Sequence, residues 1–123
     1  MMRKAVKEKI DKNTELRLGG GSLLPQRKDI PDAYKWRLED IYDSGDKWEV
    51  DFKNVRAHIP ELQRFAGRLG RSAAALLKFF RMRDELEITL GKLIVYANMK
   101  SHEDTADSKY QGPVSRVSSL AVE

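Results

Sequence analysis

The residues with the clearest chemical potential are His102 and Glu103, which stand side by side near the end of a long helical pattern. A histidine followed by a glutamate opens the zinc-binding helix motif H-E-x-x-H, in which two histidines four positions apart hold the metal and the glutamate acts as a base. Ala106 occupies the position of the second histidine here. The other histidine, His58, belongs to a different helical pattern. We therefore expect no metal ligand in this chain.

Candidate nucleophiles are equally isolated. Ser115, Ser118 and Ser119 have no histidine near them in the sequence that would act as their base. The stretch GRLGRS, residues 67–72, lacks both the spacing and the lysine of the phosphate-binding loop G-x-x-x-x-G-K-[ST]. We predict no catalytic residue and no cofactor-binding residue, and hence no cofactor, in this chain.

A run of basic residues without any acidic residue lies between Leu62 and Asp84. It is either an anion-attracting patch or, as we expect, a solvated helix edge paired with carboxylates elsewhere. Its members are Arg64, Arg68, Arg71, Lys78, Arg81 and Arg83.

The net charge of +4 is concentrated at the start of the chain. Residues 1–28 hold eight basic and three acidic residues, whereas residues 29–123 hold 15 basic and 16 acidic ones. Binding to a nucleic-acid duplex requires several cations on one face. A nucleic-acid partner is therefore unlikely.

The composition describes one small domain or a piece of a larger one, with 41% hydrophobic and 34% charged residues. Charged residues interrupt every apolar stretch, so we expect no membrane span and no secretory signal. The absence of cysteine excludes a disulfide framework and is compatible with a cytoplasmic location.

The chain divides into a flexible basic leader with a glycine-rich linker, residues 1–22, and a helical segment, residues 23–123. Two prolines, Pro25 and Pro31, predict an extended arm ahead of the first helix. That helix begins after Ser44 as N-cap, with Asp46 favourably placed in its first turn.

Apolar residues at spacings of three and four define the stripe of this first helix. Pro60 predicts a kink near Ile59 or a break into two helices. Gly67 and Gly70 are candidates for a left-handed C-cap. The stripe comprises Trp48, Phe52, Val55, Ile59, Leu62, Phe65 and Leu69.

The second helix is predicted to start after Ser72 and to continue to about Lys100. Its apolar face is wide enough for a central helix with neighbours on two sides, and Gly91 lies within it. The main stripe comprises Leu76, Phe79, Met82, Leu86, Leu90, Leu93 and Ala97, and Leu77, Phe80, Ile94 and Val95 broaden it.

A last helix is predicted after the turn SHEDTAD, with Asp104 or Thr105 as its cap and an apolar stripe from Tyr110 to Leu120. Gly112-Pro113 makes its continuity uncertain. The fold class is all-α: an antiparallel helical bundle or hairpin of three to four helices, preceded by the extended arm.

An ordered set of short motifs resembles the start of oligoendopeptidase F, a zinc metallopeptidase family of the thimet oligopeptidase group. The set begins with LPQR at residues 24–27, IP at 30–31, WRLEDIY at 36–42 and then Trp48. It continues with IPELQRFAGRLG, MRDELEITLGKLIVYANMK, EDTADSKYQ and SLAVE, so that the resemblance covers residues 24–123.

The resemblance implies that the chain is the N-terminal helical lobe of a parent of several hundred residues, whose H-E-x-x-H helix lies far downstream. Zinc is then expected in the parent, which would cleave short peptides in a channel enclosed by this lobe. The implied partners are the downstream catalytic domain and, through the parent, short peptides. The alternative is a small helical interaction or adaptor module without enzymatic activity.

Two expectations concern packing. Trp36 is expected to bury its ring against the helices and to anchor the turn that precedes them. Apolar surface left uncovered by missing partners is expected to drive self-association, either through the residue 76–97 helix or through residues 114–122.

Overall fold

The computed structural model describes residue 25 and residues 27–123, which fall into two units divided between Ala33 and Tyr34. The predicted leader, residues 1–22, lies outside the described residues. The predicted extended arm is not confirmed, because its described part forms two short 3-10 helices, η1 (Arg27–Asp29) and η2 (Asp32–Tyr34). The φ angle that proline fixes at Pro31 also suits such a turn.

Helix α2 (Gly45–Gln63) begins as predicted. The Ser44 hydroxyl accepts the backbone N–H of Lys47, and Asp46 lies in the first turn. The predicted break at Pro60 is wrong, since the helix is continuous to Gln63. Pro60 stands in the last turn, where the missing N–H removes one bond from a helix that ends three residues later.

The connection to the next helix contains the one described glycine with a positive φ, Gly67 at 70°. The left-handed prediction is confirmed there but not at Gly70, which belongs to the 3-10 helix η4 (Leu69–Arg71). Because α2 already ends at Gln63, Gly67 serves the turn rather than the helix cap. Phe65 and Leu69, predicted on the α2 stripe, therefore lie in this connection.

Helix α3 (Ala73–Glu103) is the longest element, with 31 residues. Its predicted cap is confirmed, because the Ser72 hydroxyl accepts the N–H of Ala75 at 3.1 Å. Its fully packed residues, Leu93 and Ala97, both belong to its second half.

Helix α4 (Gln111–Leu120) follows η5 (Ser108–Tyr110). The predicted caps Asp104 and Thr105 are wrong: α3 extends to Glu103, and Asp107 caps η5 by accepting the N–H of Lys109 at 2.9 Å. Gly112-Pro113 does not interrupt the helix. Pro113 lies in the first turn of α4, where backbone N–H groups have no intrahelical acceptor.

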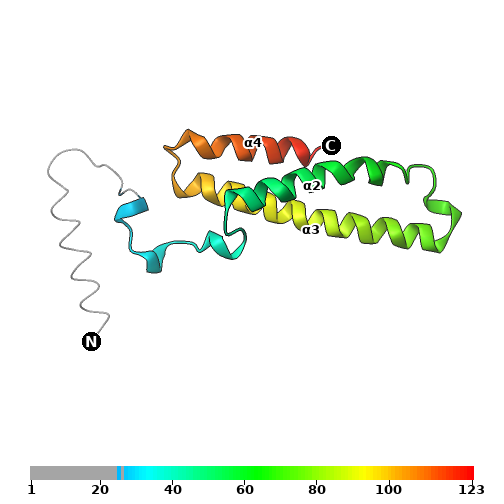
Figure 1. Cartoon of the computed structure of the whole chain (residues 1–123), viewed down its shortest axis with the longest axis horizontal. Helices are drawn as coiled ribbons and strands as arrows, with labels where there is room; N and C mark the ends of the chain where they lie inside the picture. Colours follow the sequence, from blue (N-terminus) through cyan, green and yellow to red (C-terminus); the bar gives the residue numbers. More distant parts are fainter. Residues whose placement is uncertain (1–24, 26) are drawn as a thin grey trace, which may run out of the picture. The chain divides into compact units, whose positions relative to one another are not determined.

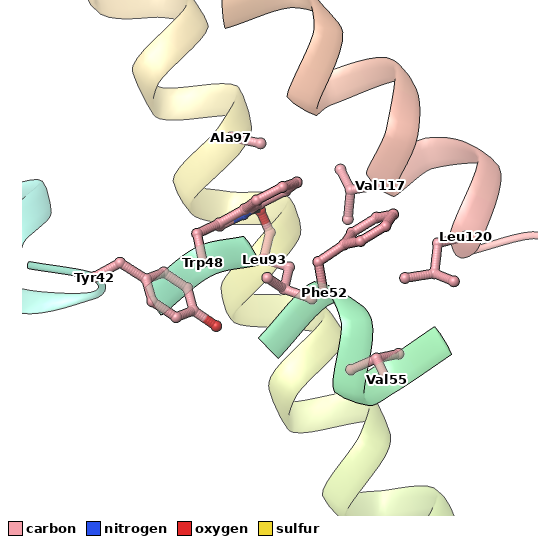
Figure 2. Close-up of a cluster of buried hydrophobic side chains, with 8 residues drawn as sticks. All are labelled: Tyr42, Trp48, Phe52, Val55, Leu93, Ala97, Val117 and Leu120. Carbon is pink, nitrogen blue, oxygen red and sulfur yellow. Dashed lines mark hydrogen bonds between the residues drawn. The ribbon is translucent and has the colours of Figure 1, made fainter. Parts of the chain in front are cut away.

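The all-helical prediction is confirmed for the described residues, which contain no strand. Helices α2 and α4 both pack on α3 (Figure 1). Side chains from all three meet in one core, drawn in Figure 2. The cluster comprises Tyr42, Trp48, Phe52, Val55, Leu93, Ala97, Val117 and Leu120.

Candidate functional site

The best-defined side-chain arrangement surrounds Trp48 on the first turn of α2. Its indole ring is buried, and its N–H donates to the backbone carbonyl of Leu93 on α3 at 3.0 Å. The ring of Phe52, one turn later, stacks on it with centroids 5.3 Å apart (Figure 2). Because a buried indole N–H requires an acceptor, this bond fixes the position of α2 along α3.

Arg116 of α4 covers the same two rings. Its guanidinium carbon lies 4.3 Å from the centroid of Phe52 and 5.5 Å from that of Trp48. The guanidinium also binds both carboxylate oxygens of Glu49, with an Nη2–Oε2 distance of 2.9 Å. Planar stacking and two-point binding suit arginine better than lysine. Arg116 thus joins α4 to α2.

This ion pair changes the acidity of both groups. The hydrogen bonds from Arg116 hold the pKa of the Glu49 carboxyl below its usual range. The same bonds raise the pKa of the Arg116 guanidinium, which remains charged at every relevant pH. Both groups are partly exposed, so the pair stabilises the packing rather than creating a reactive centre.

A second aromatic contact joins the turn before α2 to α3. Tyr42 meets Tyr96 edge to face with centroids 5.3 Å apart, and its hydroxyl donates to Asp51 at 2.8 Å. Burial, followed by the bond to this carboxylate, raises the pKa of Tyr42 well above its ordinary value. Its phenol therefore stays protonated at neutral pH and acts as a donor, not as a base.

A groove of about 500 Å³ lies beside these contacts, between the start of α2 and the end of α3. Its serine, Ser44, already caps α2, and no histidine lines it. Acid–base or nucleophilic catalysis needs such groups paired within hydrogen-bond reach. The charged lining residues of the groove are Glu39, Asp43, Asp46, Glu49, Lys100 and Lys109.

The His-Glu pair shows no metal-binding geometry. His102 is exposed, whereas the Glu103 side chain is 5% exposed and lies 3.5 Å from the ammonium of Lys100. His58 bonds the carbonyl of Asn54, four residues earlier in α2. Within residues 27–123, no three His, Cys, Asp or Glu side chains form a group able to hold a metal ion. The described chain does not fit zinc.

The predicted serine candidates are all exposed on α4. On this helix they lie on the side opposite Val117 and Leu120, which face the core. No histidine is found on α4. None of the helices described is long and apolar enough to span a membrane.

The basic run extends from the connection between α2 and α3 into the first turns of α3. Arg83 pairs with Asp84 at 2.9 Å and Glu87 at 3.4 Å, and it covers the ring of Phe80. Arg83 thus shows the pairing with carboxylates that we expected for the whole run. The other five form no ion pair with any described residue: Arg64, Arg68, Arg71, Lys78 and Arg81.

The anchor predicted at Trp36 is wrong, because its side chain is 53% exposed. Leu38, two residues later, is 1% exposed and begins the 3-10 helix η3 (Leu38–Asp40), which contacts α3. A short turn has no periodicity to show which of its apolar residues faces inward. Periodic spacing does identify Trp48 as a residue that faces inward, because it begins the apolar stripe of α2.

Comparison with known proteins identifies bacterial peptidases as relatives. The chain is 39% identical over 89 residues to oligopeptidase PepF of Bacillus subtilis (strain 168), which covers 72% of this chain and 13% of that protein. It is 32% identical over 101 residues to the chromosomal oligoendopeptidase F of Lactococcus lactis subsp. cremoris, covering 81% and 17%. Group B oligopeptidase PepB of Streptococcus agalactiae serotype III (strain NEM316) is 32% identical over 85 residues, covering 69% and 14%.

No family model matches the chain, and no solved structure matches it significantly. The chain spans less than a fifth of the length of these relatives. The aligned regions cover 69–81% of this chain. By its sequence, the chain is thus similar to oligopeptidase PepF and oligoendopeptidase F over most of its own length and a small part of theirs.

Proposed function

We propose that this chain is the N-terminal helical segment of a zinc-dependent oligoendopeptidase that cleaves short peptides, and that it contributes framework rather than catalytic groups. The observation that carries the proposal is the 30–39% identity to named oligopeptidases over most of the chain. In this role the three helices form an antiparallel bundle in the lobe that encloses the substrate channel.

The side chains support a framework role. The hydrogen bond from Trp48 to Leu93 and the ion pair of Arg116 with Glu49 lock α2, α3 and α4 together. The described residues hold no cluster able to bind a metal, so zinc would be bound by another part of the parent. The parent would supply the catalytic domain as partner, and we place it in the cytoplasm.

A chimera tests the framework role. The aligned segment of Bacillus subtilis oligopeptidase PepF would be replaced by the matching 89 residues of this chain. We expect the chimera to cleave a short fluorogenic peptide and to lose that activity in chelator. A chimera that folds, by circular dichroism and gel filtration, but leaves the peptide intact would contradict the proposal.

Matched variants of the chimera show whether activity depends on the helical core. Leu93→Asp places a charge in the core and should abolish folding and activity together. Val50→Ala changes an exposed residue of α2 and should leave both unchanged.

The free 123-residue chain provides the complementary test. After dialysis it should retain no stoichiometric zinc, and it should leave the same peptide intact. Chelator-sensitive cleavage by the pure chain would show that it carries its own active site. The adaptor alternative is not favoured, since the relatives named above are peptidases.

A further inference from the structure

Helix α3 carries a second apolar face that no described element covers. Ile88, Leu77 and Val95 have exposed fractions of 63%, 50% and 47%. Phe80 is exposed as well, and Gly91 adds a position where a new Cβ would meet no atom within 4 Å. We call these five residues the outer stripe.

The outer stripe lies opposite the core. At 100° per residue, Ile88 is about 140° around the helix from the fully buried Leu93, and Val95 is about 200° from it. Helices α2 and α4 pack on the side of Leu93 and Ala97, as Figure 2 shows. The outer stripe is therefore separate from the side of α3 that faces the existing core.

Among the charged residues on this face, which also include Arg81 and Glu85, two form a self-complementary pattern. Asp84 stands four residues before Ile88, and Lys92 stands four residues after it. Lys92 is exposed and forms no ion pair with any described residue, while Asp84 shares its carboxylate with its neighbour Arg83 alone. A second α3 running in the opposite direction, centred on Ile88, would place each Asp84 opposite a Lys92.

We propose that two copies of this chain pair through α3 in antiparallel orientation, about a two-fold axis at Ile88. Ile88 then meets Ile88 of the second copy, Asp84 meets its Lys92, and Leu77 meets its Met99. The contact runs over residues 77–99, about 33 Å of helix. An interface of this kind is isologous, since the same patch serves both copies.

The distribution of the basic residues favours the antiparallel orientation over the parallel one. In a parallel pair, Lys78 and Arg81 of α3, which form no ion pair with a described residue, would each lie beside its own copy. In the antiparallel pair, Lys78 of one copy lies about 30 Å from Lys78 of the other, well beyond the screening length of about 8 Å at physiological salt.

The position of the remaining apolar residues also selects α3. In the alternative route through residues 114–122, Val117 and Leu120 are already buried in the core, so fewer apolar side chains remain for a contact there than on α3. The proposal does not depend on the peptidase assignment, since it uses only the surface of this chain.

Disulfide cross-linking tests the axis directly, because the chain contains no cysteine. Ile88→Cys should form a covalent dimer on mild oxidation, since two side chains on the axis come within disulfide reach. Val95→Cys, the matched control, should stay uncross-linked, because its two copies would be about 21 Å apart. The double variant Arg81→Cys with Val95→Cys should cross-link again.

Sedimentation velocity of the unmodified chain, over a hundredfold range of concentration, tests whether the pair forms without a covalent bond. We expect a monomer–dimer equilibrium. Lys92→Glu should raise the dissociation constant about tenfold, because it places two like-charge pairs in the contact. Combining it with Asp84→Lys should restore the wild-type value.

A single monomeric species at every concentration would overturn the proposal. Equal cross-linking of Ile88→Cys and Val95→Cys would overturn the antiparallel orientation. Circular dichroism of each variant should show unchanged helix content, as expected for substitutions on an exposed face.

Discussion

The two halves of α3 are both rich in apolar residues but have different surroundings. Both halves carry apolar residues on two sides of the helix, yet only Leu93 and Ala97, in the second half, are less than a tenth exposed. Helix α2 has 19 residues and α4 has 10, so neither covers the whole of the 31-residue α3. The length of the neighbouring helices, and not local hydrophobicity, decides which half forms the core.

The largest expected difference between the halves concerns leucine truncation. Leu93→Ala should lower the free energy of unfolding by about 2–5 kcal/mol, because it removes a fully buried side chain and leaves a cavity. Leu77→Ala, in the first half, should change it by less than about 0.5 kcal/mol. Urea denaturation followed by circular dichroism measures both, at a protein concentration where the chain is monomeric. Equal losses would show that the first half is packed in solution.

The two tryptophans show the same contrast between a buried and an exposed side chain, outside α3. Trp48→Phe removes the hydrogen bond to Leu93 and part of a buried ring, and it should cost about 1–3 kcal/mol. Trp36→Phe alters an exposed side chain and should be close to neutral. Thermal unfolding of the two variants in parallel provides the comparison. A larger loss of stability for Trp36→Phe than for Trp48→Phe would show that Trp36, and not Trp48, anchors the helices.

The same contrast shows what could be predicted from the sequence. The caps Ser44 and Ser72 were predictable because capping depends on residues within one turn. The core positions of α2 followed from their spacing. The exposure of Trp36 and the cap at Asp107 were not predictable, because each depends on where a neighbouring helix starts or stops.

Contacts between residues far apart in the sequence were even harder to predict. Glu49 and Arg116 are 67 positions apart in the sequence and give no local signal of their pairing. The framework residues around Trp48 were therefore missed as a group, although the buried part of its stripe, Trp48, Phe52 and Val55, was predicted correctly.

A smaller effect is expected at Gly91, where α3 is exposed to solvent. Gly91→Ala should raise the free energy of unfolding by about 0.5–1 kcal/mol, because alanine loses less backbone entropy in a helix and its Cβ meets no neighbour. Thermal unfolding of a dilute sample measures the change. Ala97→Gly, at a buried position of the same helix, should lower stability by at least as much. A destabilised Gly91→Ala would indicate that something in the monomer packs against this position.

The smallest effect concerns the ion pair that joins α4 to α2. Its hydrogen bonds lower the pKa of Glu49 in the folded protein below the unfolded value of about 4.3. The unfolded state therefore binds more protons in this range, so the pair stabilises the fold above that pH and the contribution is lost as pH falls through the folded pKa. Because both side chains are more than a third exposed, we expect the contribution at pH 7 to be about 0.5 kcal/mol or less.

Glu49→Gln should therefore flatten the dependence of stability on pH between about 5 and 3, and its difference from the wild type should shrink as the pH is lowered. Glu85→Gln, which removes an exposed carboxylate with no ion pair to a described residue, is the matched control and should leave the slope unchanged. Added salt should reduce the Glu49 effect through screening. Urea titrations at each pH measure the slopes. Indistinguishable slopes for Glu49→Gln and the wild type would show that the stacking of Arg116 on Trp48 and Phe52, and not its charge, holds α4 in place.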